Sequence, residues 1–356
     1  MPAAWRIAVL ALFVARAVPA QTQAKSLIGN GWGLDHVIVA QRSFDDATQI
    51  FGAKLGFSFA PGNKFPDQGL ENGPVLLPPA YLELMWIYDP EKNAAAVKAA
   101  GPGGPLAATL RRIQAQGGAI ISYNIDVSPV EQAASFVRAR GFKVSLPPSP
   151  TTLRDGKQQP GAWQFLNISY EDSKATPPVG VPGGPGVGFL EYRNNGDRLT
   201  EDRLRQARER IERETPDPRR KPGDLHANTA RKLKSVWVAV SDLQQTVKHA
   251  EAWGFAPGRE RTLGELGARG REVQCGQGTI VFWEADKEGG PLSTIVRSGG
   301  LGPFGVSVGV EDLNRAHDIA EHGTGRQLHI EKNQGRDRFL VSAEAAGGIW
   351  VEFVQE

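Results

Sequence analysis

The chain has 356 residues, of which 22% are charged and 40% are hydrophobic, a composition typical of a soluble globular protein long enough for two domains. The formal net charge of +2 and the lack of long basic blocks outside one linker argue against a nucleic-acid partner. The single cysteine, Cys275, excludes an internal disulfide, and we expect it to be a buried small hydrophobe rather than a nucleophile.

The first 20 residues have the layout of a secretory signal peptide. Residues 1–6 carry a positive charge, residues 7–14 are apolar, and small residues precede a cleavage position after Ala20. The apolar run is too short to span a bilayer, so we expect no membrane span. The sequence therefore predicts a secreted or periplasmic protein with an N-terminal tail over residues 21–32; the alternative is a disordered hydrophobic leader.

Two strand-like segments, residues 34–40 and 80–86, each place an ionisable side chain in an apolar run. His36 shares a strand face with Ile38, and Glu83 shares one with Tyr81. A buried, unpaired carboxylate is costly unless a metal ion, a cationic partner or a proton compensates it. These two strands therefore predict a buried polar site.

The segment between these strands predicts one helix and two further strands. Ser43 is a suitable N-cap, and Gly56 a suitable end, for a helix that follows the first strand. Residues 57–60 and 75–77 have strand composition, and the loop over residues 61–72 either covers a pocket or is a surface connection. Residues 90–117 predict an alanine-rich helical insertion that contributes packing rather than chemistry.

The same order of elements recurs three more times, which indicates an internal repeat of four modules. The repeated elements are strands at 119–125, 233–240 and 304–310, helices that start near 129, 241 and 311, and closing strands at 188–192, 279–284 and 348–353. Between the second and third modules, residues 199–214 predict a solvated helix with ion pairs, and the Pro-rich residues 216–223 predict a domain boundary.

The segments "LDHVIVA" (34–40), "SFDDA" (43–47) and "YLELMW" (81–86) resemble the glyoxalase-like branch of the vicinal oxygen chelate superfamily. The resemblance implies an α+β fold in which four βαβββ modules form two half-open barrels, each around a metal or a ligand. It divides the mature chain into a glyoxalase-like domain over 33–198, a charged helix and linker over 199–232, and a second such domain over 233–356.

The family's metal ligands lie on the first and last strands of each module, so the resemblance implies roles for individual residues. His36, Glu83 and Glu191 would bind a divalent metal (Mn, Fe, Ni or Zn), with Glu83 and Glu191 also catalytic. Ser122 would replace a fourth ligand. The equivalent positions of the second pair are Ser235, Val281, Gly305 and Glu352. One carboxylate alone will not hold a divalent ion, so we expect a structural or interface role for that pair.

Looser similarities imply ligand contacts, each with a simple structural alternative. Arg154 lies in a turn before the aromatic strand that contains Trp163 and Asn167, and Arg154 would otherwise be a solvated turn charge. His226 and Asn228 form a His-x-Asn stretch like the one that enters the family's third module, and His226 would otherwise cap a turn in the linker. Asn167, Tyr123 or His226 would orient the imidazole of His36.

Two functions remain open at this point. One is metal-assisted lyase, isomerase or dioxygenase chemistry on a small substrate with two adjacent oxygens. The other is metal-free binding of a small molecule, as in bleomycin-resistance proteins, with His36 and Glu83 as a buried hydrogen-bonded pair. Either function requires a small-molecule partner and is compatible with a homodimer. Motifs for serine or cysteine nucleophiles and for phosphate-binding loops do not occur in the sequence.

Overall fold

The computed structural model describes residues 27–100, 117–154, 156–169, 176–193, 198–286, 288–333 and 336–356. The predicted signal peptide, residues 21–26 of the predicted tail and residues 101–116 of the predicted helical insertion lie outside the described residues. In the described ranges, none of the helices has the length and apolar character needed to cross a membrane.

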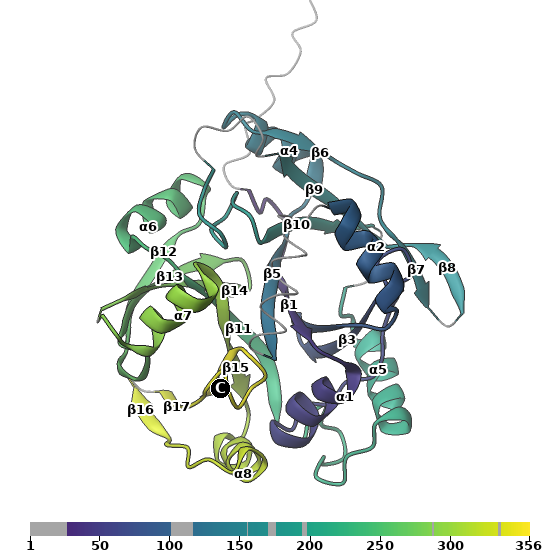
Figure 1. The fold of residues 1–356 in the computed structure, drawn as a ribbon, viewed down its shortest axis with the longest axis vertical. Coiled ribbons are helices and arrows are strands. Elements are labelled where there is room, and N and C mark those ends of the chain that lie inside the picture. Colours follow the sequence, from purple (N-terminus) through teal and green to yellow (C-terminus); the bar gives the residue numbers. More distant parts are fainter. Residues whose placement is uncertain are drawn as a thin grey trace, which may run out of the picture.

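The N-terminal half forms a curled sheet of ten strands in the order β6-β9-β10-β5-β1-β4-β3-β2-β7-β8 (Figure 1). Its strands are β1 (Gly33–Gln41), β2 (Lys64–Phe65), β3 (Leu70–Leu77), β4 (Ala80–Ile87), β5 (Gly118–Asp126), β6 (Lys143–Ser145), β7 (Thr151–Arg154), β8 (Lys157–Pro160), β9 (Trp163–Ser169) and β10 (Val187–Tyr192). Its helices are α1 (Phe44–Ala47), the π-helix η1 (Thr48–Lys54), α2 (Pro90–Ala100) and α4 (Val130–Arg138).

Helix α5 (Glu201–Glu214) leads to the second sheet, which has eight strands in the order β12-β13-β14-β11-β15-β18-β17-β16. Its strands are β11 (Ala230–Ala239), β12 (Pro257–Leu263), β13 (Ala268–Cys275), β14 (Gly278–Ala285), β15 (Gly302–Val310), β16 (Glu331–Asn333), β17 (Arg336–Val341) and β18 (Trp350–Gln355). Its helices are α6 (Leu243–Ala252), the short 3₁₀ helix η3 (Gly264–Leu266), α7 (Pro291–Gly299) and α8 (Leu313–Thr324).

The two sheets share one pairing pattern. In the first sheet, β1 is parallel to β4 and antiparallel to β5, and β5 is parallel to β10. In the second sheet, β11 is parallel to β14 and antiparallel to β15, and β15 is parallel to β18. In the second sheet, α6 packs against β13 and β14, and α8 packs against β17 and β18 (Figure 1). The predicted α+β class with curled, half-open sheets is confirmed.

Local sequence signals account for several helix boundaries. Ser43 accepts a hydrogen bond from the Asp46 amide, and Asp242 and Asp312 cap α6 and α8 in the same way. The first helix ends at Gly56, whose φ of +75° favours glycine. The predicted strand over 57–60 is wrong, because these residues are not in a strand, whereas the β7–β8 hairpin was not predicted.

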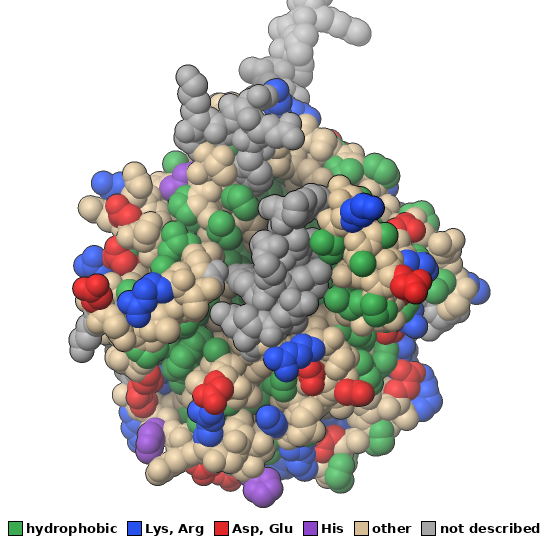
Figure 2. Space-filling model, in the orientation of Figure 1, with side chains coloured by type: hydrophobic (Ala, Val, Ile, Leu, Met, Phe, Trp, Pro, Cys, Tyr) green, Lys and Arg blue, Asp and Glu red, His purple; other side chains and the backbone are tan. Residues whose placement is uncertain are grey.

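The two halves share one hydrophobic core. Phe57 of the first half stacks on Phe353 of β18, with the ring centroids 5.7 Å apart, and Cys275 is fully buried in the same core, as predicted. At the surface, basic and acidic side chains are interspersed over the face shown in Figure 2, in keeping with the small net charge. The shared core fixes the relative positions of the two sheets.

Candidate functional site

The concave side of the first sheet encloses a cavity of about 700 Å³, here called the N-terminal cavity. Strands β1, β3, β4, β5, β9 and β10 supply its walls, and residues 60–72, Pro150, Leu199 and helix α5 supply the remainder of its lining. The loop over 61–72, which was equally consistent with a surface connection, therefore lines the cavity. A cavity of this size can enclose a small-molecule ligand.

His36 and Glu83 meet in this cavity. Strands β1 and β4 are parallel with His36 paired to Tyr81, so Glu83, two residues later, lies on the same face. The His36 Nε2 atom is 3.4 Å from Glu83 Oε2, and only 6% and 9% of the two side chains are exposed. The imidazole also stacks on the Tyr81 ring, with the centroids 4.6 Å apart. The structure thus brings together the first two predicted metal ligands.

Asp35 holds the other side of the imidazole. Its Oδ2 atom lies 2.5 Å from His36 Nδ1 and accepts a hydrogen bond of 2.8 Å from the Tyr192 hydroxyl. Strand alternation would place Asp35 on the opposite face, but the β1–β5 register shifts between Leu34 and His36. The expectation that Asn167, Tyr123 or His226 orients the imidazole is therefore wrong, and a bulge explains why Asp35 was missed.

Two asparagines complete the polar cluster. The Asn124 side-chain nitrogen is 2.7 Å from His36 Nε2, and Asn72 donates a 2.5 Å hydrogen bond to Glu83 Oε1. Asn72 is oriented in turn by the Asn63 backbone amide, which donates to its oxygen. Gly188 leaves the space that Asn124 occupies, because a Cβ atom at Gly188 would lie 1.9 Å from the Asn124 side-chain oxygen.

Burial and the neighbouring carboxylates act in opposite directions on the pKa of His36. Burial lowers this pKa, but the hydrogen bond to Asp35 and the charges of Asp35 and Glu83 outweigh burial and raise the pKa above its usual value of 6.5. The two neighbouring carboxylates therefore stabilise a positive charge on or beside the His36 imidazole. A proton is one way to supply that charge, and a metal ion in its place is another.

Glu191, the third predicted ligand, does not reach the cavity. Leu190 and Tyr192 line the cavity, so Glu191 between them points to the other face of β10. There it accepts hydrogen bonds from the Ser128 hydroxyl and the Val130 amide, both 2.9 Å, at the start of α4. The predicted set of three metal ligands is therefore wrong, because side chains alternate along β10 and Glu191 lies on the face turned away from the cavity. Within the described ranges, no three His, Cys, Asp or Glu side chains gather in a metal-binding group.

The predicted ligand contacts divide into three groups. Trp163 and Asn167 lie on the cavity wall together with Ser122, so their contact with a ligand stays a prediction. The side chain of Arg154 lies outside the part of the chain that the structure describes. His226 and Asn228 do not line the cavity, so the ligand-binding role predicted for them is wrong.

His226 is instead a structural residue in the joint between the halves. It is fully buried, accepts a hydrogen bond from the Ser58 amide at 3.0 Å, and lies 2.8 Å from the Leu76 carbonyl, to which its other nitrogen donates. Burial lowers its pKa to about 4, so the imidazole is neutral at pH 7. Asn228 bonds to the backbone of Leu55 and Ala230 in the same joint.

Helix α5 has a different role on each face. Arg205 forms exposed ion pairs with Asp202 and Glu209, as predicted for a solvated helix. The other face, which includes Arg210 and Ile211, lines the N-terminal cavity. The helix was thus predicted only in part, because its cavity-facing side depends on a sheet that is distant in sequence.

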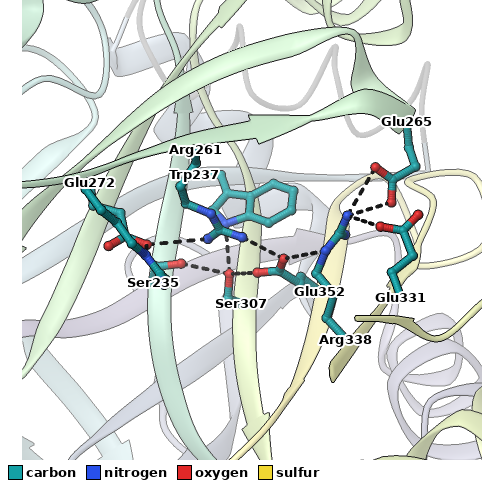
Figure 3. A network of polar contacts seen from close by, with 10 residues as sticks. Ser235, Trp237, Arg261, Glu265, Glu272, Ser307, Glu331, Arg338 and Glu352 are labelled. Atoms are coloured by element: carbon teal, nitrogen blue, oxygen red, sulfur yellow. Dashed lines mark hydrogen bonds and ion pairs between the residues drawn. The ribbon is translucent and has the colours of Figure 1, made fainter. Parts of the chain in front are cut away.

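The second sheet encloses a smaller and more polar cavity of about 430 Å³, here called the C-terminal cavity. Glu352 on β18 is fully buried, and its carboxylate lies 2.8 Å from Arg261 Nη2 and 3.7 Å from Arg338 Nε (Figure 3). Ser307 donates a third contact at 2.5 Å. Of the four equivalent positions, Ser235 and Glu352 line this cavity, whereas Val281 and Gly305 do not.

Comparisons with known proteins agree with this geometry. A family model described as a glyoxalase-like domain matches residues 34–254, which is more than half of the chain. No curated protein sequence matches the chain.

Two of the solved structures resemble the fold over most of its length, and a third covers a smaller part of it. A hypothetical protein from Staphylococcus aureus has a TM-score of 0.55 and 12% identity, over 91% of this chain and 98% of that one. A mutant of 4-hydroxymandelate synthase from Streptomyces coelicolor has a TM-score of 0.55 and 13% identity, over 91% and 92%. Methylmalonyl-CoA epimerase from Mycobacterium tuberculosis has a TM-score of 0.32 and 18% identity, over 36% and 89%. At these identities the similarity concerns the fold.

Proposed function

The chain belongs to the glyoxalase-like domain family of the vicinal oxygen chelate superfamily, and from this premise we propose that its N-terminal cavity carries out metal-assisted chemistry. The substrate class is a small molecule with two adjacent oxygens, and the reaction is of the lyase, isomerase or dioxygenase type. The observation that carries the proposal is the buried Asp35–His36–Glu83 arrangement in a cavity of ligand size.

The residues at this site fit a divalent cation. Metal-binding histidines usually donate their second nitrogen to a carboxylate, as the Nδ1 of His36 does to Asp35. The other nitrogen faces Glu83 at 3.4 Å, a spacing that suits two ligands of one ion. With its side-chain amide turned over, Asn124 would present an oxygen to the same place. His36, Glu83 and Asn124 would therefore hold the ion, and nitrogen and oxygen ligands of this kind suit Mn, Fe, Ni or Zn.

The chain's own residues would prepare the substrate for reaction. A bound cation would supply Lewis-acid stabilisation of a developing oxyanion. Asp35 and Tyr192 keep the imidazole of His36 in place, and Asn72 does the same for the Glu83 carboxylate. Glu83 borders the cavity and is the group placed to accept or donate a substrate proton. Helix α5 and residues 60–72 limit access of water.

A second candidate is metal-free binding or sequestration of a small molecule. It is favoured by the observation that the polar atoms of the cluster already have partners. Asn124 and Glu83 both contact His36 Nε2, and Glu83 also accepts from Asn72. A protonated His36 would then compensate the charge of Glu83, and the cavity would bind its ligand mainly through apolar walls.

Metal analysis of the purified protein distinguishes the two candidates. The set comprises the wild type, His36→Ala and Glu83→Ala, with Glu191→Gln as a matched control that removes one carboxylate outside the cavity. We expect about one equivalent of metal in the wild type and in Glu191→Gln, and loss of metal in the other two. Absence of metal from all four, with a small molecule still bound by the wild type, would support sequestration.

We also propose that the protein is exported, on the basis of the layout of residues 1–20. Mass spectrometry of the protein recovered from its native host tests this directly. The expected mature chain begins at Gln21, and recovery of intact residues 1–20 from the cytoplasm would contradict export.

A further inference from the structure

We propose that the C-terminal cavity is a binding site for a small oxyanion, either a carboxylate or a phosphate. This site shares no lining residue with the N-terminal cavity, so the proposal goes beyond the function proposed above and does not depend on it. The argument rests on a buried arginine with unused hydrogen-bond donors, on the network that holds this arginine in place, and on the surplus of basic side chains around it.

Arg338 on β17 is the central residue. Only 4% of it is exposed, and it lines the cavity. Its Nη2 atom donates to Glu265 at 2.9 Å and to Glu331 at 2.5 Å. Its Nη1 and Nε atoms have no hydrogen-bond partner among the described residues. Buried guanidinium groups are normally satisfied, so Nη1 and Nε of this cavity-lining arginine lack the acceptor that such groups usually have.

The Glu352 carboxylate does not serve as that acceptor, because its two oxygens already accept hydrogen bonds from other residues. Its Oε1 atom accepts from Arg261 and lies 3.7 Å from Arg338 Nε, beyond hydrogen-bond range, while its Oε2 atom accepts from Ser307. Ser307 is fixed in turn by the indole N–H of Trp237 and by Ser235. Figure 3 shows how Arg261 and Arg338 approach Glu352 from opposite sides. Glu352 therefore acts as a positioning residue that holds two guanidinium groups at the cavity.

The charge of the lining favours an anion over a cation. Five basic residues line the cavity (Lys234, Arg259, Arg261, Arg336 and Arg338) against three acidic ones (Glu260, Glu272 and Glu352). Two guanidinium groups lie where a cation would have to approach the buried carboxylate, so a metal ion would meet like charges there. Arginine forks match the oxygen pairs of carboxylates and phosphates, which accept two parallel hydrogen bonds. A volume of about 430 Å³ accommodates a small organic acid or a phosphate ester.

Isothermal titration calorimetry of the full chain tests the proposal, with inorganic phosphate and malonate as separate probes at constant ionic strength in chloride. Saturable binding of one equivalent of either probe is expected for the wild type, and the preferred probe distinguishes the phosphate class from the carboxylate class. The variant Arg338→Lys keeps the positive charge but loses the fork, and we expect it to bind about tenfold more weakly.

A matched pair keeps the test decisive if Arg338→Lys does not fold. Arg259 lines the cavity and pairs with Glu272, whereas Arg269 on the next strand pairs with Glu284 and does not line it. Both are partly exposed, and both changes to alanine remove one positive charge. We expect Arg259→Ala to weaken binding about threefold and Arg269→Ala to leave it unchanged. No saturable binding of either probe by the wild type, or equal binding by both variants, would overturn the proposal.

Discussion

Glu83 and Glu352 occupy comparable places in the two halves but have different partners. Each lies on a strand that is parallel to the first strand of its module, and each is buried. Glu83 contacts an imidazole and an amide, whereas Glu352 contacts two guanidinium groups and a hydroxyl. A guanidinium keeps its proton at any ordinary pH, but an imidazole can lose its proton or exchange it for a metal ion. The partner, rather than the carboxylate, therefore decides which cavity is suited to metal chemistry.

The largest expected effect comes from removing the two carboxylates in turn. Glu352→Ala leaves Arg261 and Arg338 without their shared counter-charge inside the protein, and we expect a loss of about 3–5 kcal/mol in the free energy of unfolding. Glu83→Ala should cost less, because His36 can respond by giving up its proton. Urea unfolding of both variants measures the difference. Equal losses would remove the contrast between the two halves.

His226, a histidine without carboxylate neighbours, provides a comparison with His36. His226 has a folded-state pKa of about 4, against 6.5 for an ordinary histidine, so between these values the unfolded chain binds a proton that the folded chain does not. Stability should therefore fall as the pH drops from 6.5 to 4, by about 3 kcal/mol from this group. Urea unfolding across this range should show a shallower pH dependence in His226→Gln. An identical dependence in both proteins would contradict the assignment.

Much of the fold could be predicted from the sequence because its signals are local. Strand composition, the caps at Ser43, Asp242 and Asp312, and the glycine at 56 each act within a few residues. The proximity of His36 and Glu83 could also be predicted, because two parallel strands with alternating side chains place them on one face.

The rest of the site depends on features that no local pattern contains. A register shift brings Asp35 beside His36, and one residue of register turns Glu191 toward α4 instead of the cavity. Of the two arginines around Glu352, Arg338 comes from the preceding strand β17, whereas Arg261 comes from β12, which is distant in sequence. Sequence alignment of the modules could not show these differences, because it assumes that equivalent strands have equivalent register.

A smaller effect should follow from changing the group behind the imidazole. Asp35→Asn keeps the size of the side chain but removes the charge that fixes His36. We expect metal affinity to fall by about 10–100-fold, the range typical of lost histidine partners in metal sites. Competition with a fluorescent chelator measures this affinity. The matched control is Asp126→Asn. It removes a carboxylate that pairs with Arg198 and does not line the cavity. A comparable loss in the control would show that Asp35 acts only through overall stability.

The smallest effect concerns the two faces of α5. Changes to alanine on either face should alter stability little, but only the change on the cavity face should alter ligand binding. Arg205 and Arg210 each form an i,i+4 ion pair, with Glu209 and Glu214, but only Arg210 lines the N-terminal cavity. Exposed pairs of this kind contribute little, so either change to alanine should cost less than about 0.5 kcal/mol in thermal or urea unfolding. Only Arg210→Ala should alter ligand binding or turnover in that cavity, because Arg205 faces solvent. Equal effects of the two changes on binding would mean that α5 is a solvated surface helix, as its sequence alone indicates, and that the strands and residues 60–72 enclose the cavity without it.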